Sequence, residues 1–106
     1  MSQKIRVSEL PDFDPAEYLH DADDIAGYLS AVLEEDDPNA VIEALGTIAR
    51  ARGMTEIARD AGLAREALYR ALRDGASPRF DTVMRVIRAL GMQLVAVPDS
   101  HRAAHG

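Results

Sequence analysis

The sequence of 106 residues contains no cysteine and no tryptophan, and only 5% of its residues are aromatic. The absence of cysteine excludes a disulfide framework, a thiolate metal site and a cysteine nucleophile. No apolar run reaches the roughly 18 residues of a membrane-spanning helix, and the N-terminus lacks the basic and then apolar pattern of a signal peptide. We therefore expect one small domain in the cytoplasm.

Candidate catalytic and metal-binding residues are also scarce. The three histidines are His20, His101 and His105, and two of these fall in the last six residues. No serine, histidine and aspartate form a useful triad, and no glycine-rich loop resembles a phosphate cradle. Neighbouring carboxylates such as Asp23 and Asp24 are typical of a solvated surface rather than of an acid–base pair. We expect neither an enzyme nor a cofactor or metal.

Basic residues are nearly absent from the first part of the chain. Residues 1–45 contain twelve acidic residues and two basic ones, whereas residues 46–106 contain six acidic residues and ten arginines. The net charge of the whole chain is −6. Parts of opposite charge are typical of a protein with two different partners, although solvated acidic helix faces produce the same pattern.

Capping residues and apolar periodicity predict an all-α fold of about six helices. Asp21 or Asp23 is expected to cap the second helix, Asp37 the third and Thr55 the fourth. The expected helices cover approximately residues 14–19, 21–36, 38–52, 55–61, 64–73 and 80–90. Residues 92–97 read as a short strand before Pro98, although periodicity alone does not separate a strand from further helix there.

These elements divide the chain into three parts. Residues 1–13 form an N-terminal arm, residues 14–98 a single helical domain, and residues 99–106 a flexible tail. Within the domain we distinguish acidic N-terminal helices (14–37), a helix-turn-helix core (38–91) and the strand (92–97). The expected hydrophobic core consists of Ile42, Leu45, Ile48, Ile57, Ala58, Leu63, Leu68, Phe80, Val83, Val86, Ile87 and Leu90.

The stretch TEIARDAGLAREALYRALRDG, residues 55–75, meets the requirements of a helix-turn-helix. The small Ala58 allows a second helix to pack closely against the first. Gly62 lies four residues later, where a left-handed turn would cost a residue with a Cβ about 1–2 kcal/mol. Leu63 then supplies the apolar residue that closes the core beneath the turn.

The same register directs several polar side chains of the second helix away from the core. In a major groove, arginine reads guanine through two parallel hydrogen bonds, while nearby side chains hold the phosphate backbone. Exposed arginines also occur on helices that bind nothing. We predict a DNA-binding site made of Thr55, Arg65, Glu66, Tyr69, Arg70, Arg73, Ser77 and Arg79.

One subunit of this kind reads only a few base pairs, so a homodimer on two half-sites about 34–36 Å apart is expected. An isolated strand leaves its backbone groups unpaired, and pairing with its own copy would satisfy them. The predicted dimer interface therefore consists of Met92, Leu94, Val95 and Val97.

Several segments resemble the HigA-like antidote (antitoxin) proteins of addiction modules, which contain a lambda-repressor-like helix-turn-helix domain of the XRE/Cro type. The most specific are ARARGMT, GLAREALYRAL and ALGMQL, and the resemblance covers about residues 14–95. It implies an antitoxin that neutralises a small basic toxin of the RelE/ParE-like class and represses its own operon. Such proteins usually carry serine where this chain has Ala64, which removes a helix-capping acceptor worth about 1 kcal/mol.

The resemblance suggests a partner for the acidic residues, because a toxin that acts on RNA presents a basic surface. Opposite charges would accelerate the encounter. Helix capping by itself explains some of these carboxylates. The predicted toxin-binding residues are Asp21, Asp23, Asp24, Glu34, Glu35 and Asp36. Two alternatives stay open: a free-standing repressor without a toxin, and an acidic adaptor that no longer binds DNA.

Overall fold

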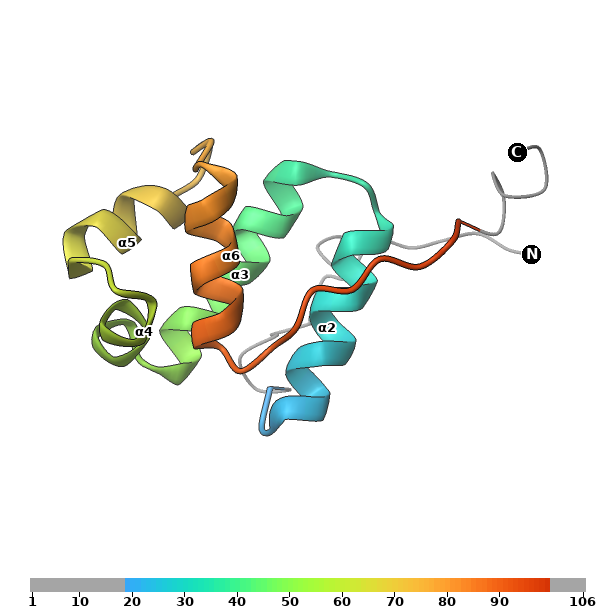
Figure 1. Cartoon of the computed structure of the whole chain (residues 1–106), viewed down its shortest axis with the longest axis horizontal. Coiled ribbons are helices and arrows are strands. Elements are labelled where there is room, and N and C mark those ends of the chain that lie inside the picture. Colours follow the sequence, from blue (N-terminus) through green and yellow to red (C-terminus); the bar gives the residue numbers. More distant parts are fainter. Residues whose placement is uncertain (1–18, 100–106) are drawn as a thin grey trace, which may run out of the picture.

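The computed structural model describes residues 19–99. This part contains five helices and no β-strand: α2 (Ala22–Glu34), α3 (Pro38–Arg52), α4 (Met54–Ala61), α5 (Arg65–Leu72) and α6 (Phe80–Ala89) (Figure 1). The prediction of an all-helical fold is confirmed for these residues. The arm at 1–13, the helix expected at 14–19 except for Leu19, and the tail beyond Asp99 lie outside the described residues.

Aspartates begin the two longest helices, as the sequence predicted. The Asp21 carboxylate accepts a hydrogen bond from the Asp24 backbone N–H at 2.9 Å, which caps α2. The Asp37 carboxylate accepts from the Asn39 N–H at 3.0 Å, and Pro38 occupies the first turn of α3. Each aspartate satisfies a donor that the helix itself leaves unpaired.

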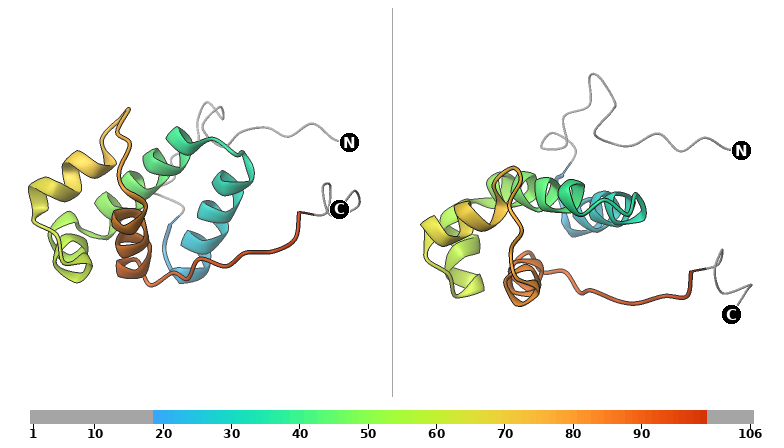
Figure 2. Two further views of the ribbon diagram at one scale, coloured as in Figure 1. Left: turned by 45° about the horizontal axis from the view of Figure 1, so that its top comes forward. Right: turned by 90° about the horizontal axis from the view of Figure 1, so that it is seen from above.

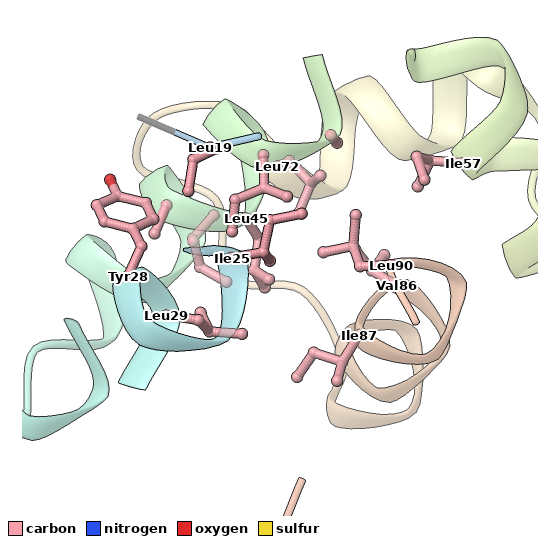
Figure 3. Packing of buried hydrophobic residues seen from close by; sticks show 14 of the residues in the cluster. Leu19, Ile25, Tyr28, Leu29, Leu45, Ile57, Leu72, Val86, Ile87 and Leu90 are labelled. Atoms are coloured by element: carbon pink, nitrogen blue, oxygen red, sulfur yellow. The ribbon is translucent and has the colours of Figure 1, made fainter. Parts of the chain in front are cut away.

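The core forms where α3 packs against α2, α4 and α5, while α6 packs chiefly against α4. Leu45, Ile48 and Leu68 are completely buried, and Leu45 lies between Ile25 of α2 and Leu72 of α5 (Figure 3). In the right-hand view of Figure 2, α6 and the segment after it lie on one side of the layer that α2 and α3 form. Helices α2 and α5 lie at opposite ends of the described molecule (Figures 1 and 2).

The backbones of α3 and α5 approach closely at Gly46. A Cβ at this position would lie 3.3 Å from the Leu72 carbonyl oxygen and 3.3 Å from Arg50 Nη1. A larger residue would require the Leu72 carbonyl and the Arg50 side chain to give way by a few tenths of an ångström. Gly46 therefore helps to fix where the C-terminal end of α5 sits on the core.

Phe80 is not part of the core, contrary to the sequence prediction, because 68% of its surface is exposed. It continues the apolar stripe of α6 by one turn, but no helix covers that turn. The side chain instead borders a shallow hollow together with Pro38 and Pro78. The other predicted core residues are buried or, like Leu63 and Val83, packed partly buried against the core.

The strand predicted at residues 92–97 does not form in the described chain. A strand requires a neighbouring strand to pair with its backbone, and residues 19–99 offer none. Met92 packs partly buried against the core, whereas Val95 and Val97 are 67% and 76% exposed. Pairing of this segment with a second copy stays a prediction. None of the described helices has the length and apolarity needed to cross a bilayer.

Candidate nucleic-acid interface

A left-handed glycine joins α4 to α5. Gly62 has φ 73° and ψ 32°, and the Leu63 N–H donates to the Ala58 carbonyl at 2.9 Å. This bond, which reaches back five residues across the turn, is characteristic of a Schellman C-cap. Apart from Gly62 itself and its two chain neighbours, no residue has an atom within 4 Å of a Cβ built on Gly62, so the backbone conformation rather than crowding requires glycine. The predicted turn geometry at this residue is confirmed.

The prediction that Thr55 caps α4 is wrong. Gly53 ends α3 and begins α4 at once: its N–H donates to the Ala49 carbonyl, and its own carbonyl accepts from the Ile57 N–H. Its φ of 112° lets the chain change direction within a single residue. Thr55 therefore lies inside the first turn of α4, where its side chain is exposed.

Helix α5 presents a polar face to solvent. Leu68 and Leu72 are buried on its inner side. The outer side carries four exposed residues that the sequence analysis selected for DNA binding: Arg65, Glu66, Tyr69 and Arg70. A fifth, Arg73, is exposed as well, but it follows the helix and has an extended backbone. The helix begins at Arg65, and Ala64 contributes no side-chain cap. The helix thus presents two guanidinium groups to solvent, and a third lies on the residue that follows it.

Arg65 and Tyr69 form a pair on this face. Arg65 Nη2 donates a hydrogen bond to the Tyr69 hydroxyl at 3.1 Å, and the guanidinium carbon lies 5.4 Å from the centre of the tyrosine ring. The two residues are four apart and therefore neighbours on the helix surface. The contact restricts the Arg65 side chain near the N-terminal end of α5, the end from which recognition helices contact base edges.

Arg70 and Arg73 meet Ser77 around a hollow of about 400 Å³ between α5 and the loop that follows it. The structure thus brings together residues from two segments that the sequence analysis grouped only by their chemistry. Arg79 does not line this hollow. Its Nε donates to the Asp81 carboxylate at 3.2 Å, and this hydrogen bond holds the pKa of Asp81 below its ordinary value of 3.8.

The predicted toxin-binding residues fall into two groups at opposite ends of α2. Asp21, Asp23 and Asp24 lie at its start, and Glu34, Glu35 and Asp36 at its end. At 1.5 Å per residue, the groups are about 20 Å apart. Asp24 also accepts a hydrogen bond from the His20 N–H at 3.1 Å, so the first group has a structural role in the helix start. In the described part of the chain, no cluster of three or more histidines, aspartates and glutamates is placed to hold a metal ion.

Sequence reasoning missed the apolar hollow beside Phe80. Pro38, Val41, Pro78 and Val83 contribute to its lining, and its volume is about 340 Å³. The sequence feature that could have indicated this hollow is the position of Phe80 in the first turn of α6, shortly after a proline. An apolar stripe that reaches the first turn of a helix often extends beyond the neighbour that covers it.

Comparison with known proteins assigns the chain to a family. A family model described as "probable addiction module antidote protein" matches residues 9–98. The chain is also 51% identical over 87 residues to an uncharacterised protein of Haemophilus influenzae strain Rd, across 82% of this chain and 90% of that protein. No solved structure matches significantly. The chain therefore belongs to this family of addiction-module antidote proteins.

Proposed function

We propose that the protein is the antitoxin of a toxin–antitoxin pair, which neutralises a small basic RelE/ParE-like toxin in the cytoplasm and represses its own operon. The family match over residues 9–98 carries the antitoxin part of this proposal. It also implies a toxin as the natural partner. We propose no catalytic activity and no resident cofactor.

The exposed face of α5 supports the repressor part. In this HigA-like, helix-turn-helix interpretation, α4 crosses the DNA backbone and α5 enters the major groove. Arg65 and Arg70 are the candidates for guanine contacts, since arginine matches the two acceptors of guanine. Ser77 and Arg79 lie just beyond the helix, where contacts to phosphate would position it.

The separation of charge explains how an acidic protein would approach DNA. Helix α2, which has acidic residues at both of its ends, lies at the far end of the described molecule from α5 (Figure 1). Exposed charges further apart than about 8–10 Å are largely screened in physiological salt. The arginines therefore act locally, while the acidic end attracts a basic toxin.

The proposal predicts a small basic open reading frame beside the gene, and the product of that reading frame is used to test toxin binding. We expect its product to stop growth, and co-expression of the antitoxin to restore it. The informative variant changes the end of α2: Glu34→Lys, Glu35→Lys and Asp36→Asn. Asparagine is used at residue 36 because its φ of 59° is left-handed, which asparagine tolerates.

A matched variant applies the same change of charge elsewhere on the exposed surface: Glu56→Lys, Asp60→Lys and Asp74→Asn. We expect the α2 variant to weaken the complex about tenfold or more at low salt, and the matched variant to weaken it much less. Calorimetry or biolayer interferometry measures both. Equal affinities for the two variants would show that the C-terminal end of α2 is not part of the toxin interface.

A further inference from the structure

The acidic side chain of α5 lies at the centre of the exposed face of this helix. Glu66 is the second residue of α5 and is exposed. Successive residues of an α-helix are turned by about 100° from one another, so Glu66 points almost directly away from the completely buried Leu68. Arg65 and Tyr69 lie on one side of Glu66, and Arg70 lies on the other. A ligand that covers this face therefore meets a carboxylate between two guanidinium groups.

The Glu66 carboxylate is not used within the described part of the chain. The exposed ion pairs between residues 19 and 99 join Arg59 to Asp60 and Arg79 to Asp81, and Glu66 takes part in none of the side-chain hydrogen bonds there. Arg65 donates to the Tyr69 hydroxyl instead. An ionised carboxylate only accepts hydrogen bonds. The acceptor capacity of Glu66 is therefore open to a donor from another molecule.

Stabilisation of the helix start explains a carboxylate in the first turn of α5, but not its place on the outward face. A negative charge in the first turn favours a helix, and Glu56 occupies the corresponding turn of α4. A carboxylate on another side of the first turn of α5 would serve equally well. At the centre of a face that meets DNA, it is repelled by the phosphates. A hydrogen-bond donor on the DNA would offset that repulsion.

The major groove offers few such donors. Guanine presents two acceptors, and thymine presents an acceptor and a methyl group, so neither base satisfies a carboxylate. Adenine presents its N6 amino group beside the N7 acceptor, which repels one of the carboxylate oxygens. Cytosine presents its N4 amino group without an acceptor on the same base. A carboxylate at the floor of the groove is therefore satisfied best by cytosine.

We propose that Glu66 selects cytosine at one position of the sequence that α5 reads, by accepting a hydrogen bond from the N4 amino group. The assignment rests on the proposed function, because it requires α5 to enter the major groove. Arg65 and Arg70 donate to guanines at neighbouring positions, and their charges reduce the repulsion between Glu66 and the phosphates. Guanine or thymine at the Glu66 position leaves a desolvated carboxylate without a donor, so Glu66 contributes chiefly to discrimination between sequences.

The test replaces the carboxylate with an amide of the same size. Glutamine matches the N7 acceptor and the N6 donor of adenine, so Glu66→Gln should prefer adenine where the wild type prefers cytosine. Selection from a pool of random duplexes gives the preferred sequence of the full chain and of the variant. Fluorescence anisotropy at fixed salt then compares duplexes that differ only at this base pair. We expect the wild type to bind the cytosine duplex about tenfold more tightly than the adenine duplex, and Glu66→Gln to reverse the order.

Glu56→Gln is the matched control. It removes an exposed carboxylate from the first turn of α4 and changes the net charge by the same amount. Because Glu56 lies outside α5, this variant should keep the preference for cytosine. Circular dichroism checks that both variants retain the wild-type helix content.

The possible failures of this inference and of the proposed function are distinct. If Glu66→Gln keeps the wild-type preferred sequence and binds every duplex more tightly by the same factor, Glu66 only repels DNA and the inference is overturned, while the repressor proposal stands. A wild type that prefers adenine at this position, or the same change of preference in Glu56→Gln, would also overturn it. A wild type that selects no sequence from the pool would contradict the repressor proposal and this inference together.

Discussion

Tyr69 is positioned to restrict the orientation of the Arg65 guanidinium group. Its hydroxyl accepts a hydrogen bond from Arg65, and its ring lies beside the same guanidinium. An arginine that is already held in one orientation loses less conformational entropy when it binds. If Arg65 reads guanine, Tyr69 therefore contributes to affinity without needing to touch the DNA.

Replacing Tyr69 separates the two contacts. Tyr69→Phe removes the hydroxyl acceptor and keeps the ring, so we expect operator binding to weaken by about 0.5–1.5 kcal/mol. Tyr69→Ala removes both contacts and should weaken binding further. Fluorescence anisotropy on the promoter duplex measures each affinity. Wild-type affinity in Tyr69→Ala would show that the pair has no role in recognition.

Gly62 is required for its backbone conformation alone, which makes its substitution easy to interpret. Its φ is 73°, and no residue other than its chain neighbours has an atom within 4 Å of the position that a methyl group would take. Gly62→Ala should therefore cost about 1–2 kcal/mol of unfolding free energy. Gly27→Ala is the control, because Gly27 lies within α2 and also has open space around it. There alanine should stabilise by about 0.5–1 kcal/mol. Urea denaturation measures the unfolding free energy of both variants. A change of the same sign in the two would contradict the left-handed turn assigned to Gly62.

At the scale of elements, the contact between α3 and α5 determines the position of the arginine face. Gly46→Ala places a methyl group 3.3 Å from the Leu72 carbonyl oxygen, which is backbone and yields little. We expect a loss of about 1–3 kcal/mol in unfolding free energy, despite the better helix propensity of alanine. Thermal denaturation measures it. A variant as stable as Gly27→Ala would show that the helices adjust freely at this point.

The packing of α2 on α3 predicts a response to alkaline pH. Burial raises the pKa of the Tyr28 hydroxyl above its ordinary value of 10.0, and the carboxylates of Glu43 and Glu35 raise it further. Because the folded pKa exceeds the unfolded one, the neutral phenol contributes stability that is complete below about pH 10 and is lost as the pH rises through the folded pKa.

Chemical denaturation at several pH values above about 10 checks this expectation. The unfolding free energy of the wild type should fall with pH, and that of Tyr28→Phe should fall less steeply. Tyr69→Phe, which removes an exposed phenol from α5, is the comparison. A wild type and Tyr28→Phe with the same slope would contradict the assignment of this response to α2.

Local chemistry allowed the helix starts and the central turn to be predicted, because Asp21, Asp37 and Gly62 act within a few residues of their own position. The errors concern relations between distant segments. Periodicity identified the inner face of α6, but not that the neighbouring helices stop short of Phe80. The β-branched, apolar run suggested a strand at residues 92–97, but a strand also needs a partner, which the described chain does not supply. For the site, the outward face of α5 followed from its register, whereas the meeting of Arg70, Arg73 and Ser77 required the folded loop.

At the scale of the whole molecule, the helical arrangement keeps two oppositely charged surfaces apart. Helix α2, which has acidic residues at both of its ends, and helix α5, which carries Arg65 and Arg70, lie at opposite ends of the described chain (Figure 2). Under the proposed function, this separation would let one protein attract a basic toxin and bind DNA without its own charges cancelling. The proposed repression depends on the exposed face of α5.

The most direct measurement is the affinity of the protein for the DNA upstream of its own gene, by fluorescence anisotropy at fixed salt, against an unrelated duplex. We predict a clear preference for the upstream DNA, which Arg70→Ala weakens by about 1–3 kcal/mol. Arg88→Ala removes an exposed arginine from α6, beside Met84 and Met92 and away from α5, and should leave the affinity unchanged. An absent preference, or equal losses from Arg70→Ala and Arg88→Ala, would contradict the assignment of α5 as the DNA-binding surface.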